Sequence, residues 1–144
     1  MPNPNTDFSS GASLLAAQQN RFPRGVMALT TSTSNVIAFG VLAGLSTTFT
    51  AVANRLYKVS LHIVTSSATP TSRIIVGFTG NSTRPIDYTV AISNFNSITG
   101  FGVQTYAAGA QTINVQWSLI SGSVSPAAAA GNPHQLVIED LGPS

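Results

Sequence analysis

Cysteine is absent from this chain of 144 residues, and charged side chains are scarce. Without cysteine, neither a disulfide-stapled domain nor a cysteine-ligated zinc site can form. Six basic and four acidic residues make up 7% of the chain and leave a net charge of +2. Nucleic-acid binding needs clustered lysine and arginine, whereas the basic residues here are spread thinly. We therefore expect no nucleic-acid partner.

Long apolar runs are missing as well. No stretch approaches the roughly 18 apolar residues that a membrane-spanning helix needs. The polar, proline-containing start at residues 1–5 lacks the basic and apolar segments of a secretory signal. The sequence predicts a soluble chain with no export signal of its own and no membrane partner, and its length suits one domain with a single core.

Hydroxyl side chains are abundant: serine and threonine together number 34. The exposed faces are therefore expected to be rich in hydroxyl groups rather than ions. A lone soluble monomer usually carries more charge, so this composition favours extensive contact between subunits. A merely neutral, polar β-domain is the alternative.

The first 25 residues differ from the rest. Residues 1–10 read as an extended arm, and residues 10–21 form the one convincing helix, with Ser10 or Ser13 as its N-cap. Phe22 precedes a proline and so ends the helix. We expect residues 1–25 to form an anchor and residues 26–144 to form one β-domain.

From residue 25 onward the hydrophobic pattern has a period of two, which is typical of half-buried strands. The clearest alternations lie at 56–65 and 111–120. Further strands are predicted at 26–30, 36–42, 47–52, 73–79, 86–92, 101–106 and 134–141, with a small-residue loop at 121–131. Eight to ten short strands predict an all-β fold, an antiparallel β-sandwich and most simply a jelly roll.

The acidic residues do not form a catalytic pair. Asp7, Asp87, Glu139 and Asp140 are the whole supply. Glu139 and Asp140 are adjacent in a predicted strand, so their side chains point to opposite faces. We expect one of them to meet a lysine or arginine across the sheet or across a subunit boundary.

The two histidines, His62 and His134, lack the Gly-x-Ser-x-Gly turn of a serine hydrolase. Both are predicted to be polar residues of a surface or an interface, although a trimer axis could gather three copies of one around a metal. The Asn81-Ser82-Thr83 glycosylation sequon reads as a chance match in a turn. We predict no catalytic, metal-binding or cofactor-binding residue, and no enzyme.

The aromatic residues suggest one further class. Trp117 is in phase with Ile113, Val115 and Leu119, which predicts core packing. Tyr88 and Tyr106 are candidates for exposed loop aromatics, which a carbohydrate-binding module would stack on sugars.

Three segments carry a resemblance to a known family: 16–26 (AAQQNRFPRGV), 49–59 (FTAVANRLYKV) and the ending LVIEDLGP at 136–143. Together they resemble tail-associated jelly-roll domains in phages of actinobacteria, and the second is loosely similar to a strand of TNF/C1q-like jelly rolls. The resemblance implies a virion protein, usually trimeric and made in the host cytoplasm.

The leading hypothesis is a non-enzymatic virion structural protein of the capsid decoration or minor capsid type. It would be a homotrimer on the particle exterior, and residues 1–25 would attach it to capsid or tail proteins. One alternative is a tail-fibre or tail-tip protein that contacts the host, and another is a module that binds a host surface glycan. A hydrolase ranks third among the classes.

Overall fold

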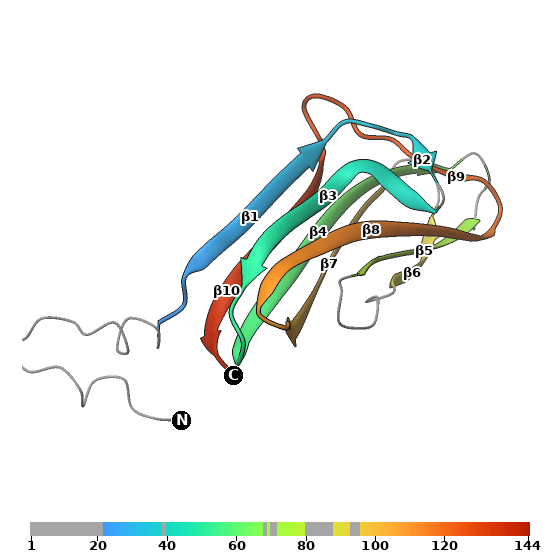
Figure 1. The fold of residues 1–144 in the computed structure, drawn as a ribbon. Helices are drawn as coiled ribbons and strands as arrows, with labels where there is room; N and C mark the ends of the chain where they lie inside the picture. The colour runs from blue at the N-terminus through green and yellow to red at the C-terminus, as the bar shows by residue number, and fades with distance from the viewer. Residues whose placement is uncertain (1–21, 39, 68, 70–71, 80–87, 93–95) are drawn as a thin grey trace, which may run out of the picture.

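The computed structural model describes residues 22–38, 40–67, 69, 72–79, 88–92 and 96–144. They form ten strands in two stacked layers (Figure 1). The strands are β1 (Gly25–Ser32), β2 (Ile37–Ala38), β3 (Val41–Ala51), β4 (Arg55–Ser67), β5 (Ser72–Thr79), β6 (Tyr88–Ile92), β7 (Asn96–Thr105), β8 (Gly109–Ser121), β9 (Val124–Pro126) and β10 (His134–Pro143).

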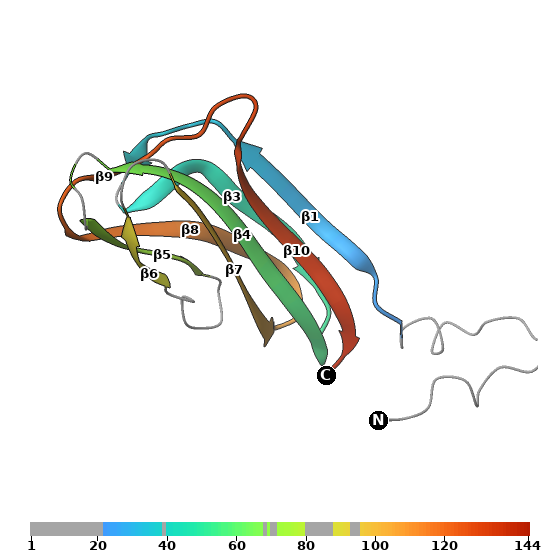
Figure 2. The same ribbon diagram turned by 180° about the vertical axis from the view of Figure 1, so that it is seen from behind.

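The layers are two antiparallel sheets. Sheet A has the order β1-β10-β4-β7, with β9 also pairing with β4, and sheet B has the order β2-β3-β8-β5-β6. The neighbours in sheet A and two of the four pairs in sheet B are strands that do not follow each other in sequence, as Figure 2 shows for β1, β10 and β4. Two such sheets with Greek-key crossovers define a jelly roll. The predicted fold class, an antiparallel β-sandwich, is confirmed.

The predicted helix at 10–21 and most of the proposed anchor lie outside the described residues. Within the described part of the chain, no helix is long and apolar enough to span a bilayer.

The core lies between the sheets, because alternate residues of each long strand point inward. In β4 the buried set is Tyr57, Val59, Leu61 and Ile63, and in β8 it includes Ile113, Val115 and Trp117. Phe49, Tyr57 and Tyr106 form an aromatic cluster with ring centroids 5.1–5.8 Å apart and tilted or edge-on planes. The predicted core position of Trp117 is confirmed.

Three predicted segments have wrong boundaries. The expected strand at 36–42 is broken at Gly40, whose φ of 75° turns the chain between β2 and β3, and the expected strand at 47–52 is part of β3. The expected loop at 121–131 contains β9, which pairs with the end of β4. Neither the turn at Gly40 nor β9 has a hydrophobic pattern that sets it apart from the neighbouring sequence.

A bulge in β3 explains an irregular pattern of burial. The pairing of β3 with β8 shifts between Val41 and Ser46, and Gly44 within this segment has a φ of 74°. The extra residues let Leu42 and Leu45 both reach the core, although they are three positions apart. A Cβ on Gly44 would lie 2.7 Å from Ser32 Oγ, so only glycine fits there.

Candidate functional site

The outer face of sheet A carries exposed apolar side chains on β1 and β7, which flank β10 and β4 in the sheet, and at Leu141 on β10. The central row of paired residues contains Leu29, Val137, Ser60 and Phe101. The row below it contains Val26, Glu139, Lys58 and Val103. Val26, Leu29 and Phe101 are each about 60% exposed, and Val103 and Leu141 are also exposed. Contiguous apolar patches on soluble proteins mark interaction sites.

One ion pair interrupts this apolar face. Lys58 Nζ lies 3.1 Å from Glu139 Oε2, and both side chains are about one-third exposed. Lys58 Nζ also lies 5.5 Å from the centroid of the Phe101 ring, a cation–π contact. Because Lys58 and Glu139 belong to the same row, their charges cancel and the row has no net charge.

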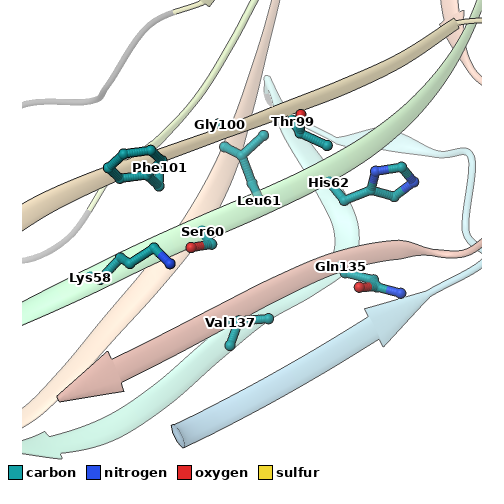
Figure 3. Close-up of a pocket in the computed structure, with 9 residues that line it drawn as sticks. All are labelled: Lys58, Ser60, Leu61, His62, Thr99, Gly100, Phe101, Gln135 and Val137. Atoms are coloured by element: carbon teal, nitrogen blue, oxygen red, sulfur yellow. The ribbon is translucent and has the colours of Figure 1, made fainter. Parts of the chain in front are cut away.

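A third row, above the apolar one, is polar: Thr31, Gln135, His62 and Thr99. Between the polar and apolar rows lies an open depression of about 500 Å³ on β10, β4 and β7 (Figure 3). Its lining residues are Lys58, Ser60, Leu61, His62, Thr99, Gly100, Phe101, Gln135 and Val137.

The polar groups of the depression are not arranged for nucleophilic catalysis. A serine nucleophile needs a base within hydrogen-bond reach. Ser60 Oγ is buried without a hydrogen-bond partner, and the His62 ring bonds through Nε2 to Asn132 Oδ1 at 3.2 Å. His62 is half-buried on the outer face, as predicted. In the part of the chain that the structure describes, no three His, Asp or Glu side chains gather to hold a metal ion.

Glu139 and Asp140 do point to opposite faces, and each meets a basic partner. Asp140 is fully buried and accepts two hydrogen bonds from Arg55, from Nε at 2.7 Å and from Nη2 at 2.8 Å. Both side chains lie at the base of the core, next to Tyr57 in the sheet register. Arg55 Nη2 also donates to the carbonyl oxygen of Phe22, which fixes the entry of the chain into β1.

The environment of Asp140 favours its charged form. Burial alone would raise the pKa of this carboxyl group, but the hydrogen bonds from Arg55 and from the Gly142 amide, with the charges of Arg55 and Arg24, outweigh it. The net result is a pKa below the usual value of 3.8. The Gly142 N–H lies 2.8 Å from Asp140 Oδ1, and a bulge between these two residues allows β10 to continue to Pro143.

His134 contradicts the sequence-based prediction of a surface or interface residue. It is the first residue of β10, and its side chain is completely buried. Nδ1 accepts a hydrogen bond from the Val64 amide at 3.1 Å, whereas Nε2 is buried with no partner. Burial, with a smaller contribution from the nearby His62, lowers the pKa of His134 below 6.5.

Two further predictions are wrong. Tyr106 is buried beside Phe49 and Tyr57, and its hydroxyl group contacts Gln104 Nε2, so it is not available for stacking on a sugar. Burial raises its pKa, and the Gln104 contact offsets part of this rise. Leu119, predicted to face the core, is about half exposed near the end of β8. The side chain of Tyr88 and the sequon at 81–83 lie outside what the structure describes.

The outer face of sheet B has a different chemistry. Ser46 pairs with Asn114, and its hydroxyl group donates to Asn114 Oδ1 at 2.7 Å. The Thr48 and Thr112 hydroxyl groups form a hydrogen bond of 2.9 Å. Side-chain hydroxyl and amide groups therefore line the middle of β3 and β8, where sheet A exposes valine, leucine and phenylalanine.

No protein-family model matches this sequence, and no curated protein matches it. Among solved structures, the globular domain of zebrafish complement 1qA protein is 14% identical and has a TM-score of 0.47. Murine APRIL is 17% identical and has a TM-score of 0.45. Each likeness covers 81% of this chain and 95% of the other. The strand order of sheets A and B itself defines this chain as a jelly roll.

Proposed function

We propose that this chain is a non-enzymatic structural protein of a phage virion, a homotrimer assembled through the outer face of sheet A. It would be displayed on the particle exterior as a capsid decoration or minor capsid protein. The observation that carries the proposal is the set of exposed apolar residues in register on this face, among them Val26, Leu29 and Phe101. Burying one such side chain contributes about 1.5–3 kcal/mol.

The charge of the face supports a second copy of the chain as its partner. A face without net charge can be buried between copies of the chain without leaving an unpaired charge desolvated. Lys58 and Glu139 neutralise each other within the face, and the rest of both apolar rows is uncharged. The trimeric state and the place on a virion rest on the resemblance of segments 16–26, 49–59 and 136–143 to phage tail-associated jelly rolls.

The route of the chain supports attachment through residues 1–25. β1 begins at Gly25, which pairs with Asp140 near the C-terminus, at the same end of the sandwich as the Arg55–Asp140 pair (Figure 2). Arg55 holds the Phe22 carbonyl oxygen at this end. Phe22 thus lies at one defined end of the sandwich, and we expect capsid or tail proteins to bind residues 1–25 at this end. A tail-fibre or tail-tip position is the alternative placement.

Self-association is tested by analytical ultracentrifugation of the full chain. The wild type should sediment at three times its subunit mass of 14.9 kDa. Leu29→Lys combined with Phe101→Lys should yield folded monomers, because each lysine would have to be desolvated in the interface. Thr48→Lys with Thr112→Lys is the matched control on sheet B and should remain trimeric. A monomeric wild type, or an unchanged trimer in the first variant, would refute assembly through sheet A.

The anchor is tested separately by deleting residues 1–22. We expect trimers that no longer attach to particles lacking this protein, whereas full-length chain does attach. Unchanged attachment of the shortened chain would refute the anchoring role while leaving the assembly surface in place.

A further inference from the structure

The backbone of β4 changes partners at Val64. Up to His62 its edge pairs with β10, and from Thr65 onward the same strand pairs with β9. Between these two partners the Val64 carbonyl oxygen accepts a hydrogen bond from the Ala127 amide at 3.0 Å. The Val64 amide has no strand partner on β10, and it donates to Nδ1 of His134 instead.

This geometry requires a neutral imidazole. Nδ1 accepts a hydrogen from the Val64 amide, so it carries no proton of its own, and the single ring proton is on Nε2. Protonation would turn Nδ1 into a second donor facing the Val64 N–H. It would also place a positive charge on a side chain that has no exposed surface and whose Nε2 already lacks a partner.

Among the residues that the structure describes, no counter-ion compensates such a charge. The elements around His134, namely β1, β3, β7, β9 and residues 127–133, contain no ionisable side chain. On β4 the nearest ionisable residue is His62, whose positive form repels a proton on His134. Glu139, on β10 itself, lies five residues along the strand, roughly 16 Å away at about 3.3 Å per residue. It is already paired with Lys58, and Asp140 is paired with Arg55.

We propose that His134 is an acid-sensitive clasp, whose protonation releases the junction of β10, β4 and β9 and frees residues 127–133. The clasp holds the end of the sandwich opposite Gly25, because His134 pairs with Ser32 at the far end of β1. This property belongs to the single subunit and does not depend on the proposed virion role.

The pH range follows from the direction of the shift. The pKa of His134 is lowered by folding, so the stability of the closed form relative to the open form is greatest above about 6.5 and declines as the pH falls below that value. Each pH unit below about 6.5 should favour the open form by up to about tenfold, until the pKa of the closed form is reached. Asp140 remains charged throughout this range, since its pKa lies below 3.8.

The test is amide hydrogen exchange of the full chain by NMR between pH 7.5 and 5, corrected for the intrinsic pH dependence of exchange. In the wild type, the protection factor of the Val64 amide should fall by up to about tenfold per pH unit, together with those of residues 127–133. His134→Asn offers Oδ1 in place of Nδ1 and cannot titrate, so its protection should be independent of pH. His62→Gln is the control and should retain the wild-type slope.

Three results would overturn the proposal. The first is pH-independent protection of the Val64 amide in the wild type, and the second is a dependence of this protection on pH that is equally steep in His134→Asn. The third is a loss of protection in acid that is spread evenly over all strands. If His134→Asn does not fold, the imidazole ring protons of the wild type decide the question. Titration of His134 at or above the ordinary histidine pKa would reject the clasp, and titration well below it, coincident with Val64 exchange, would support it.

Discussion

The two outer faces of this sandwich are built on the same core, yet one exposes apolar residues on β1 and β7, whereas the middle of β3 and β8 on the other carries paired hydroxyl and amide groups. On sheet B, the hydroxyl groups of Thr48 and Thr112 form a hydrogen bond with each other. On sheet A, the equivalent outward positions of β1 and β7 hold Leu29 and Phe101, which leave a large apolar surface in contact with water. The contrast teaches that low charge is shared by both faces, whereas exposed apolar residues in register distinguish the face through which we propose assembly.

The largest expected effect on stability is at Asp140, whose side chain lies on the inner side of sheet A. Asp140→Asn leaves the Arg55 charge buried without a counter-charge, which should lower the free energy of unfolding by about 3–5 kcal/mol at pH 7. Asp140 has a lowered pKa, so its contribution is present above about 3.8 and is lost as the pH falls below that value. The difference between variant and wild type should therefore shrink in acid.

This difference is measured by urea unfolding, with Trp117 as the single tryptophan probe, in the monomeric Leu29→Lys/Phe101→Lys background. Glu139→Gln, the neighbouring carboxylate on the outer face, is the control and should cost at most about 1 kcal/mol. Equal losses for the two variants would contradict the division between a buried and a surface ion pair.

A smaller effect is expected for the Lys58–Glu139 pair, in self-association rather than in folding. Once the sheet A face is buried between copies, Glu139→Gln would leave Lys58 without its partner and should weaken assembly by about 2–5 kcal/mol. Replacing both residues, by Lys58→Met and Glu139→Leu, should restore most of that loss, because no buried charge then remains. Sedimentation equilibrium measures both. An unchanged association constant in Glu139→Gln would place the ion pair at the rim or outside the contact.

The smallest effect concerns sheet B. The coupling energy of the Thr48 and Thr112 hydroxyl groups, from a double-mutant cycle with valine at each position, should be about 0.2–1 kcal/mol in folding. The state of association should not change in any member of the cycle. Dissociation of a threonine-to-valine variant would show that sheet B also contributes to assembly, and the contrast between the faces would fail.

The fold could be predicted from the period-two pattern because each strand has one face in the core. The same pattern could have placed His134 correctly, since it shares its phase with Leu136, Ile138 and Asp140. A polar residue at the start of the predicted strand 134–141 was instead assigned to the surface. In the same way, Arg55 shares the phase of Tyr57, so the pattern could have placed it in the interior beside Asp140.

The sheet A face itself could not be predicted from local sequence patterns. Its rows combine residues of β1, β4, β7 and β10, and their alignment depends on pairing between strands that are up to about a hundred residues apart. Val26, Leu29 and Phe101 resemble core residues in the sequence. Only the register shows that they point outward. Likewise, only the tertiary structure shows that Tyr106, expected to be exposed, is buried, and that Leu119, expected to be buried, is exposed.

The position of β10 also bears on synthesis of the chain. Among the described strands of sheet A, β10 is synthesised after all the others, yet it lies between β1 and β4. β1 precedes the other described strands in the chain, and β10 is the one strand of sheet A with which it pairs among them. Sheet A therefore cannot close until β10 has been synthesised, and the long sequence separation of its pairs favours slow folding. Chains truncated before His134 would expose the unpaired edges of β1 and β4, a hazard for aggregation that chains containing β10 avoid.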